Sequence, residues 1–198
     1  MLEMKKGCKV ARNDVLCEQY QICENSIISN VNASKIEEVF QHFIAIQQER
    51  LFFILELPAG ENDEIKLRKD NTAPMHKDIY YIDGLTSEQA LVLLMRYGEL
   101  LINDGLCQFG FGVHDNSAEL MSNKYNVLEL WTNNIGNYRD FFDAHDILQT
   151  EKIVTAWDTF SEETPGQCSR VEINGLNIFD LPRELADWGI YFAEQREE

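Results

Sequence analysis

Apolar residues recur at intervals of three and four positions in four stretches of the chain, 34–48, 87–103, 135–145 and 180–192. One face of an α-helix repeats with this spacing, so each stretch is predicted to be an amphipathic helix. The inward side of the last one is predicted to consist of Leu185, Trp188 and Phe192.

Capping pairs mark where these helices begin. Ser34 is followed three residues later by Glu37, and Thr86 is followed by Gln89. In a capping box the first side chain accepts a hydrogen bond from the backbone N–H of the later residue, whose side chain accepts one from the first residue's N–H. We expect both pairs to form such boxes, and Asp180 to cap the last helix.

Shorter apolar runs predict the strands of a sheet, at 51–57, 78–82, 107–113, 125–131 and 153–160. The first run, Leu-Phe-Phe-Ile-Leu-Glu-Leu, is continuous and ends at a Pro and a Gly, so it is expected to be a central strand buried on both faces. A tight hairpin is predicted at the Asn-Gly pair 174–175. Its cross-strand pairs would be Val171 with Ile178 and Ile173 with Leu176.

The run at 107–113 alternates large residues with glycine. Phe109 and Phe111 fall on one face of the strand, and Gly110 and Gly112 fall on the other. A face made of glycine presents no side chains, so a neighbouring group is expected to lie close to it.

Together these elements predict one α+β domain over residues 1–198, with a mixed, largely antiparallel sheet and about four helices packed on it. Residues 1–30 show little periodicity and are predicted to hold a short strand or two. Residues 59–76 are the most polar and mixed in charge, and are predicted to be a flexible loop.

The net charge of −17 is concentrated after residue 77. Residues 78–198 hold 22 Asp and Glu against 7 Lys and Arg, a net of −15, whereas residues 1–77 hold 12 against 10, a net of −2. A field of one sign repels nucleic acid and anionic membranes and attracts basic protein surfaces. We therefore expect a basic protein partner, with no nucleic-acid and no membrane binding. A homodimer is also compatible with the sequence, because an interface could use the near-neutral residues 1–77.

Other composition signals narrow the setting of the protein. The N-terminal region has no apolar run of signal-peptide length, which predicts a cytoplasmic location. The five cysteines are an odd number without a C-x-x-C pair and are expected to be free thiols. No cofactor motif and no metal-ligand spacing is present, so neither a cofactor nor a metal site is expected.

One position could carry chemistry. His114 and Asp115 follow the glycine-walled strand, and a histidine beside carboxylates can act as a general base or hold a cation. A small enzyme or a ligand- or metal-binding domain with a site near His114, Asp115 and Asp158 is the alternative function. A row formed by Asp140, Asp143 and Asp146 is interpreted as a solvated acidic helix face.

The main hypothesis is an acidic protein-interaction module. Aromatic residues concentrate at interface cores, so an exposed tryptophan would favour this reading. The interaction candidates are Trp131, Trp157, Glu119, Asp143 and Asp146. In size, acidity and α+β composition the chain is similar to bacterial immunity proteins as a broad class, without a shared motif. That similarity implies an inhibitor that covers the cleft of a cationic toxin or nuclease.

Overall fold

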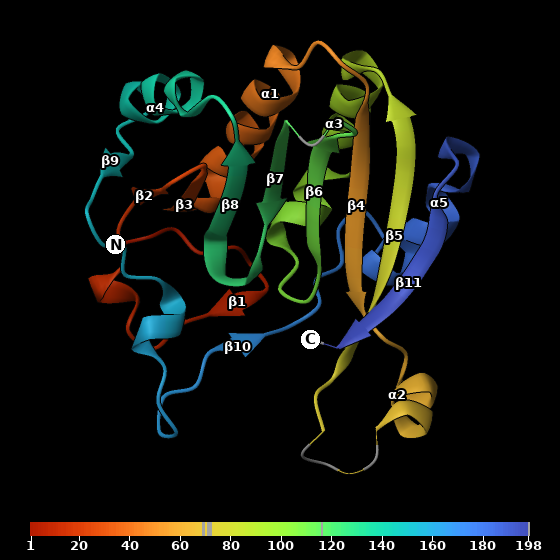
Figure 1. The fold of residues 1–198 in the computed structure, drawn as a ribbon. Helices are drawn as coiled ribbons and strands as arrows, with labels where there is room; N and C mark the ends of the chain where they lie inside the picture. The colour runs from red at the N-terminus through yellow and green to blue at the C-terminus, as the bar shows by residue number, and fades with distance from the viewer. Residues whose placement is uncertain (69, 71–72, 116, 198) are drawn as a thin grey trace.

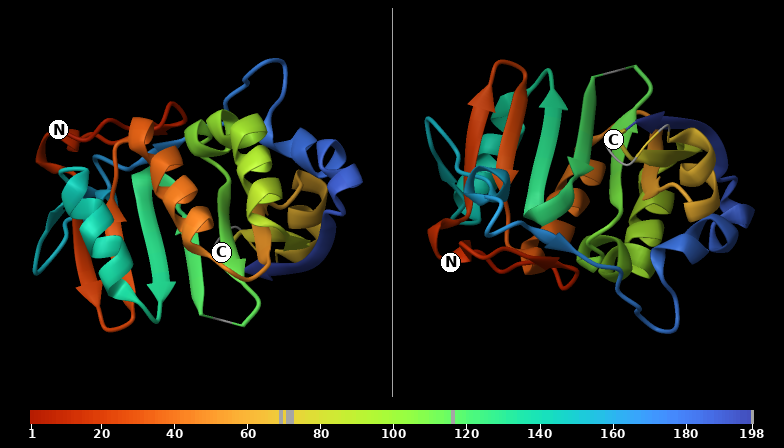
Figure 2. Two further views of the ribbon diagram at one scale, coloured as in Figure 1. Left: turned by 90° about the horizontal axis from the view of Figure 1, so that it is seen from above. Right: turned by 90° about the horizontal axis from the view of Figure 1, so that it is seen from below.

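Two helices, α1 (Ile36–Ile46) and α3 (Ser87–Asn103), lie next to each other against one face of a large β-sheet (Figure 1; Figure 2). The structure is a computed structural model and describes residues 1–68, 70, 73–115 and 117–197. Within these residues nine strands form the sheet, and no helix is both long and apolar enough to cross a membrane. The predicted single α+β domain with a mostly antiparallel sheet is confirmed.

The strand order explains how distant segments meet. In spatial order the strands are β11 (Tyr191–Glu197), β5 (His76–Leu85), β4 (Leu51–Pro58), β6 (Gln108–Val113), β7 (Ala118–Ser122), β8 (Val127–Thr132), β3 (Ser26–Asn30), β2 (Gln19–Cys23) and β9 (Leu148–Gln149). All neighbouring strands are antiparallel except β2 and β9. A separate pair, β1 (Cys8–Lys9) and β10 (Gln167–Cys168), lies below the sheet in Figure 1. The other helices are α2 (Glu61–Leu67), α4 (Ile135–Ala144) and α5 (Leu181–Glu184).

The core lies between α1, α3 and the facing side of the sheet. Phe40 of α1 stacks on Phe109 of β6 with ring centroids 4.7 Å apart, and Phe53 of β4 contacts Phe111 at 5.2 Å. All four rings are fully buried. Burial of such a side chain stabilises a fold by about 1.5–3 kcal/mol relative to leaving it in water. The continuous run at 51–57 is an interior strand, as predicted, because β5 and β6 pair with both of its edges.

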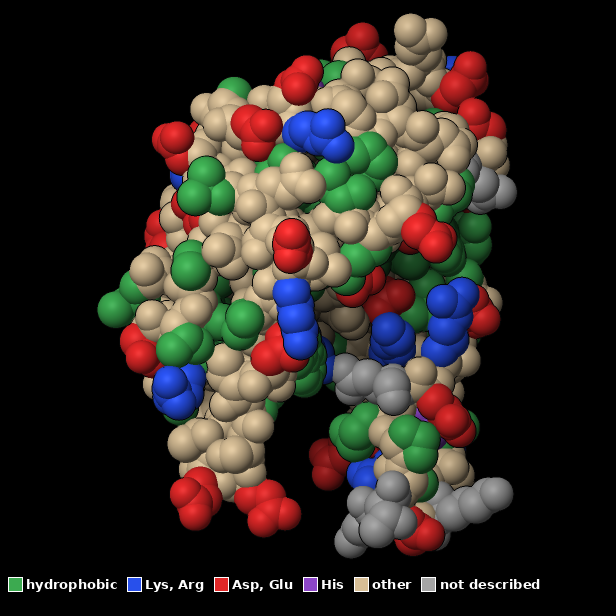
Figure 3. Space-filling model, turned by 60° about the vertical axis from the view of Figure 1, so that its left-hand side comes forward, with side chains coloured by type: hydrophobic (Ala, Val, Ile, Leu, Met, Phe, Trp, Pro, Cys, Tyr) green, Lys and Arg blue, Asp and Glu red, His purple; other side chains and the backbone are tan. Residues whose placement is uncertain are grey.

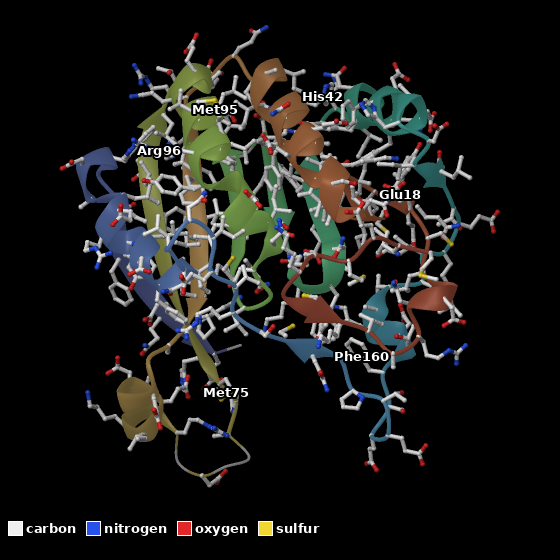
Figure 4. The ribbon with its side chains drawn as sticks, turned by 180° about the vertical axis from the view of Figure 1, so that it is seen from behind. Glu18, His42, Met75, Met95, Arg96 and Phe160 are labelled. Atoms are coloured by element: carbon white, nitrogen blue, oxygen red, sulfur yellow. The ribbon has the colours of Figure 1, made fainter. Side chains whose placement is uncertain are left out.

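Helix α4 covers the end of the sheet near β2. Phe142 of α4 stacks on Tyr20 at 5.0 Å, and Phe141 stacks on His42 of α1 at 4.3 Å. Figure 4 shows His42 on the side of α1 that is turned toward α4. The aromatic positions of the predicted helix at 135–145 therefore do bury one side of it.

One of the two predicted capping boxes is present. Thr86 Oγ1 accepts from the N–H of Gln89 at 3.2 Å, and Gln89 Oε1 accepts from the N–H of Thr86 at 2.9 Å. The prediction for Ser34 was wrong, because its hydroxyl donates to Glu3 Oε2 at 2.6 Å and the residue lies in a short 3-10 turn before α1. The Glu3 side chain thus binds the Ser34 hydroxyl that would otherwise have capped the helix.

The predicted last helix is split. Helix α5 is followed by a single 3-10 turn, and Gly189 then adopts a φ of +82°, which reverses the chain direction. Residues from Tyr191 onward form β11, so Phe192 lies on an edge strand and not on the inward side of a helix. Asp180 does not cap α5, since its Oδ2 accepts instead from the N–H of Asn177 at 3.1 Å.

Three further segments differ from their predictions. Residues 156–159 form a 3-10 helix and not part of a strand, because the Asp158 carboxylate binds back to Thr155 and closes a turn. Residues 61–67 of the predicted flexible loop 59–76 form α2, while 69 and 71–72 lie outside the described residues. The hairpin at 170–179 retains only the Ile173–Leu176 bridge, with Asn174 and Gly175 at positive φ as a type I′ turn requires.

Residues 1–30 were predicted to hold a short strand or two. They form the β2–β3 hairpin and the short strand β1. Lys5 in this segment is only 1 % exposed, and its backbone N–H donates to Asn126 Oδ1 at 2.9 Å. Polar side chains, which carry no periodicity, therefore help the buried Leu2, Leu16 and Tyr20 to hold this segment in place.

Candidate interaction surface

The face of the sheet opposite α1 and α3 is called the open face here, because no helix of the described residues lies over it (Figure 2). Residues directly opposite each other in antiparallel strands point to the same side. Since Phe53 and Phe111 point into the core, their neighbours Phe52 and Gly112 belong to the open face. By the same register the face includes Ile54, Glu56, Lys77, Tyr81, Gly110, Glu119, Met121, Glu129, Trp131, Ile28, Tyr191, Glu194 and Arg196.

Two glycines allow side chains of neighbouring strands to lie flat on this face. A Cβ at Gly112 would stand 2.3 Å from the Phe52 ring, and a Cβ at Gly110 would stand 2.3 Å from Met121 Sδ. The close neighbours predicted for the glycine face are therefore side chains from the adjacent strands β4 and β7. Both glycines are buried by these groups and do not leave an empty site.

Trp131 stands beside two carboxylates on the open face. Glu119 of β7 is directly opposite Trp131 of β8, and Glu129 lies two residues before Trp131 on the same strand. The Trp131 side chain is 41 % exposed. These three residues, with Met121 and Ile28, border a pocket of about 310 Å³. We call this the Trp131 pocket.

Burial alters the electrostatics of Glu119. Desolvation raises the pKa of Glu119, the nearby Glu56 carboxylate raises it further, and Arg196 opposes both effects. Glu56 itself is paired with Lys77 Nζ, and Arg196 is paired with Glu194. Among the described residues no salt bridge to Glu119 is present, so its charge is available to a cation from outside.

His114 lies at one end of the open face. Its Nε2 is 3.5 Å from Asp83 Oδ1, and its ring is 5.4 Å from the ring of Phe52. The hydroxyl of Tyr191 donates to the other Asp83 oxygen at 2.7 Å. His114 is therefore tied to the rim of the surface through Phe52 and Asp83.

Asp115 and Asp158 are held in separate turns. Hydrogen bonds from Ser117 lower the pKa of Asp115, whose Oδ1 accepts from the Ser117 N–H at 2.9 Å. Hydrogen bonds from the backbone and hydroxyl of Thr155 lower the pKa of Asp158. In Figure 1 the end of β6 that leads into residues 114–115 and the 3-10 helix around 156–159 lie at opposite ends of the molecule. The structure does not bring Asp158 to His114.

The remaining candidates lie away from the open face. Asp143 on α4 accepts from the Tyr20 hydroxyl at 3.0 Å, and Asp146 follows that helix with a φ of +58°. Trp157 is 55 % exposed and packs edge-on against Tyr125, with centroids 5.0 Å apart. No group of three or more His, Cys, Asp or Glu suited to a metal ion occurs in the described part of the chain.

Acidic side chains are spread over the surface that Figure 3 displays, with hydrophobic side chains between them. Sequence reasoning named Glu119 and Trp131 but missed that they are opposite each other, and it missed Glu129, Met121 and Phe52. The missing piece was β7, Ala-Glu-Leu-Met-Ser, in which burial alternates along the strand but polarity does not, because Leu120 and Met121 are both apolar. The sequence therefore contained only a weak signal for placing Glu119 and Met121 on one face.

Comparisons with known proteins do not indicate a function, so the functional conclusion rests on the surface described above. No protein-family model matches the sequence, and neither the curated proteins nor the solved structures contain a significant match to it.

Proposed function

We propose that the protein is an interaction module whose open face binds a basic protein, with a lysine or arginine side chain of the partner in the Trp131 pocket. One observation carries this proposal. An exposed tryptophan stands beside two carboxylates on the uncovered side of a sheet whose other side packs against α1 and α3.

The pocket fits a cationic side chain for two physical reasons. A cation over a tryptophan ring is attracted by about 0.5–2 kcal/mol, and more when water is excluded. Glu119 already bears part of the cost of desolvation, as its raised pKa indicates. A cation placed beside it would add to the charge interaction that Arg196 already provides.

The rest of the open face supports the partner's aliphatic groups. Met121, which borders the pocket, and Phe52, whose ring lies against Gly112, are half-buried and provide apolar surface on this face, and exposed apolar surface rimmed by charge is typical of interfaces. The net charge of −17 adds long-range attraction, which speeds association with a basic partner and weakens as salt rises. A second copy of this chain carries the same charge and is repelled from this face.

Peptides of defined charge test the proposal. An arginine- and leucine-rich peptide and its citrulline analogue, which is neutral but nearly the same shape, are titrated calorimetrically into the protein at 50 and 300 mM NaCl. We expect the arginine peptide to bind and the citrulline peptide to bind at least about tenfold more weakly.

Variants locate the binding. Trp131→Ala and the double variant Glu119→Gln/Glu129→Gln are each expected to weaken binding of the arginine peptide by about tenfold or more. Loss of a hot-spot residue has an effect of this size. The matched control is Glu162→Gln/Glu163→Gln, which removes the same two charges from exposed positions outside the open face. Equal weakening by both double variants would show that net charge alone acts, and would reject the open face as the site.

The finer version of this function is an inhibitor of the immunity type. In that version the open face covers a cationic cleft of the partner. A bound basic enzyme should then lose its activity at one-to-one stoichiometry, and Trp131→Ala should restore that activity. If the partner stays fully active when it is saturated with this protein, the inhibitory role is rejected and the binding role alone is retained.

A further inference from the structure

Two cysteines that are 160 residues apart in the sequence face each other across the β1–β10 pair. Cys8 is the register partner of Cys168, and their Sγ atoms are 3.9 Å apart. Both are free thiols in this structure. A disulfide has an S–S length near 2.05 Å, so closing the bond requires the sulfurs to approach by about 2 Å.

The backbone places the two thiols at a register position that a disulfide can span. The N–H of Ser169 donates to the carbonyl of Gly7 at 2.8 Å, which makes Gly7 and Ser169 a hydrogen-bonded pair. The next pair, Cys8 with Cys168, is therefore a non-hydrogen-bonded pair. Opposite Cα atoms at such positions are about 4.5 Å apart, which lies inside the range that disulfides span.

Close backbone packing fixes this register. A Cβ at Gly7 would stand 2.3 Å from the backbone nitrogen of Gly105 and 2.5 Å from the carbonyl oxygen of Ser169. The N–H of Gly105 in turn donates to the carbonyl of Ser169 at 3.1 Å. Strands β1 and β10 are thus held against the end of α3, and the thiols cannot drift apart without local unfolding.

The surroundings of the pair distinguish the two sulfurs. Cys8 is 4 % exposed, whereas Cys168 is partly exposed to solvent. Hydrogen bonds from the Cys8 thiol and the Tyr125 hydroxyl, together with the charges of Lys124 and Lys5, lower the pKa of Cys168 to about 6. The pKa of Cys8 is raised, because it donates to Cys168 and is buried.

The buried lysine completes the arrangement. Lys5 is 1 % exposed, and its ammonium donates to the carbonyl of Asn123 at 2.8 Å. No salt bridge from Lys5 to a carboxylate is present among the described residues. A thiolate at Cys168 supplies a negative charge with which the Lys5 ammonium interacts. Figure 4 shows Phe160 at the same end of the molecule, near β10.

We propose that Cys8 and Cys168 form a redox-active pair, in which Cys168 reacts with a hydroperoxide and Cys8 then closes a disulfide. In the first step the Cys168 thiolate attacks the peroxide, the O–O bond breaks, and with one proton the products are Cys168 sulfenic acid and an alcohol or water. In the second step the Cys8 thiol displaces hydroxide, which leaves as water with the thiol proton. Two electrons pass from the dithiol to the peroxide, and an external thiol pair returns them.

The test uses the full chain in a Cys17→Ser/Cys23→Ser background, because Cys17 and Cys23 are less buried and would react as well. Cys107 remains as an internal control, since burial raises its pKa to about 12. One equivalent of hydrogen peroxide is expected to remove two titratable thiols, to lower the mass by two hydrogens and to give a peptide that joins residues 8 and 168. Dithiothreitol should reverse all three changes.

Variants separate a redox pair from ordinary thiols. Cys8→Ser keeps a hydroxyl donor to Cys168, so Cys168 should alkylate with a pH midpoint below that of a free thiol and accumulate a sulfenic acid that dimedone traps. Cys8→Ala loses that donor, and Tyr125→Phe loses the other, so both should move the midpoint upward. The proposal is overturned if the two thiols survive stoichiometric peroxide in folded protein, or if the Cys168 midpoint is that of a free thiol, about 8.5. Circular dichroism spectra must match between variants for either result to count.

Discussion

The carboxylate of Asp104 accepts a hydrogen bond from the backbone N–H of Val171 at 2.9 Å, across 67 residues of sequence. Its other oxygen accepts from the N–H groups of Leu106 and Cys107, at 2.7 and 3.1 Å. Asp104 is fully buried and directly follows α3. One side chain thus joins the end of the helix, the start of β6 and the segment after β10.

Replacement of Asp104 should destabilise the protein strongly. Asp104→Ala leaves one buried and two partly buried N–H groups without their acceptor, and loss of hydrogen bonds to a charged group costs about 1.5–3 kcal/mol each in favourable cases. We expect a loss of at least about 3 kcal/mol in the free energy of unfolding, measured by urea denaturation. Asp187→Asn, at an exposed position, is the control and should change stability by less than about 0.5 kcal/mol. A small effect of Asp104→Ala would mean that water replaces the carboxylate.

The two glycines of β6 should differ in their tolerance of alanine. In a strand, alanine normally stabilises by about 0.5–1 kcal/mol relative to glycine. At Gly110 the new Cβ would lie 2.4 Å from the carbonyl oxygen of Leu120, which cannot move without shifting β7, whereas at Gly112 it meets only the Phe52 ring. We expect both variants to be less stable, and Gly110→Ala to lose more, within about 1–3 kcal/mol.

A second substitution checks the cause at Gly112. Phe52→Leu removes the ring atoms that the new Cβ would meet. In that background Gly112→Ala should cost less than it does in the native chain, as denaturation midpoints would show. An unchanged cost would assign the effect to the backbone of β6.

The free energy of unfolding should depend on pH in a way that reflects the raised pKa of Glu119. Its pKa is raised in the folded state by burial, so its protonated form is favoured there. Such a group supports folding fully below the unfolded pKa, and this contribution is lost as the pH rises through the folded pKa. Glu119→Gln should therefore unfold at a higher urea concentration than the native protein at pH 7, and the difference should shrink at pH 4 and below. A variant that is less stable at pH 7 would show that Arg196 outweighs desolvation.

The Glu56–Lys77 pair should behave as a unit. Lys77 Nζ contacts Glu56 Oε2, and both side chains are mostly buried on the open face. Lys77→Met leaves a carboxylate without its cation and should cost about 2–4 kcal/mol, while Glu56→Gln/Lys77→Met should recover most of that loss. A double-mutant cycle by thermal or urea unfolding measures the coupling energy. Additive effects of the two single changes would indicate that water already screens the pair.

Several features of the fold that depend on neighbouring residues in the sequence were predicted correctly. The box of Thr86 and Gln89 predicted the start of α3, and the alternation around Gly110 predicted a close neighbour on that face. Both signals consist of residues within a few positions of each other, although the groups that lie on the glycines come from other strands. The fold class followed in the same way, since helix and strand periods are set by short stretches.

Long-range contacts decided the rest. Residues 191–197 are mostly charged and polar, and they are a strand only because β5 offers them an unpaired edge. Asp158 forms a turn through Thr155 in a stretch whose alternation equally suits a strand. The Trp131 pocket joins the consecutive strands β7 and β8 to β3, which lies far earlier in the chain, and the Cys8–Cys168 pair joins strands that are 160 residues apart, so local spacing predicted neither.

The pairing of β11 with β5 has a consequence for the growing chain. Tyr81 and its partner Tyr191 are 110 positions apart, counted from their residue numbers. At about 5–20 residues per second a ribosome needs about 5–20 s to make that interval. Throughout it, the outer edge of β5 has no strand beside it, and an uncovered edge can pair with the edge of another chain. Newly made molecules in this interval are therefore the ones most in need of a chaperone.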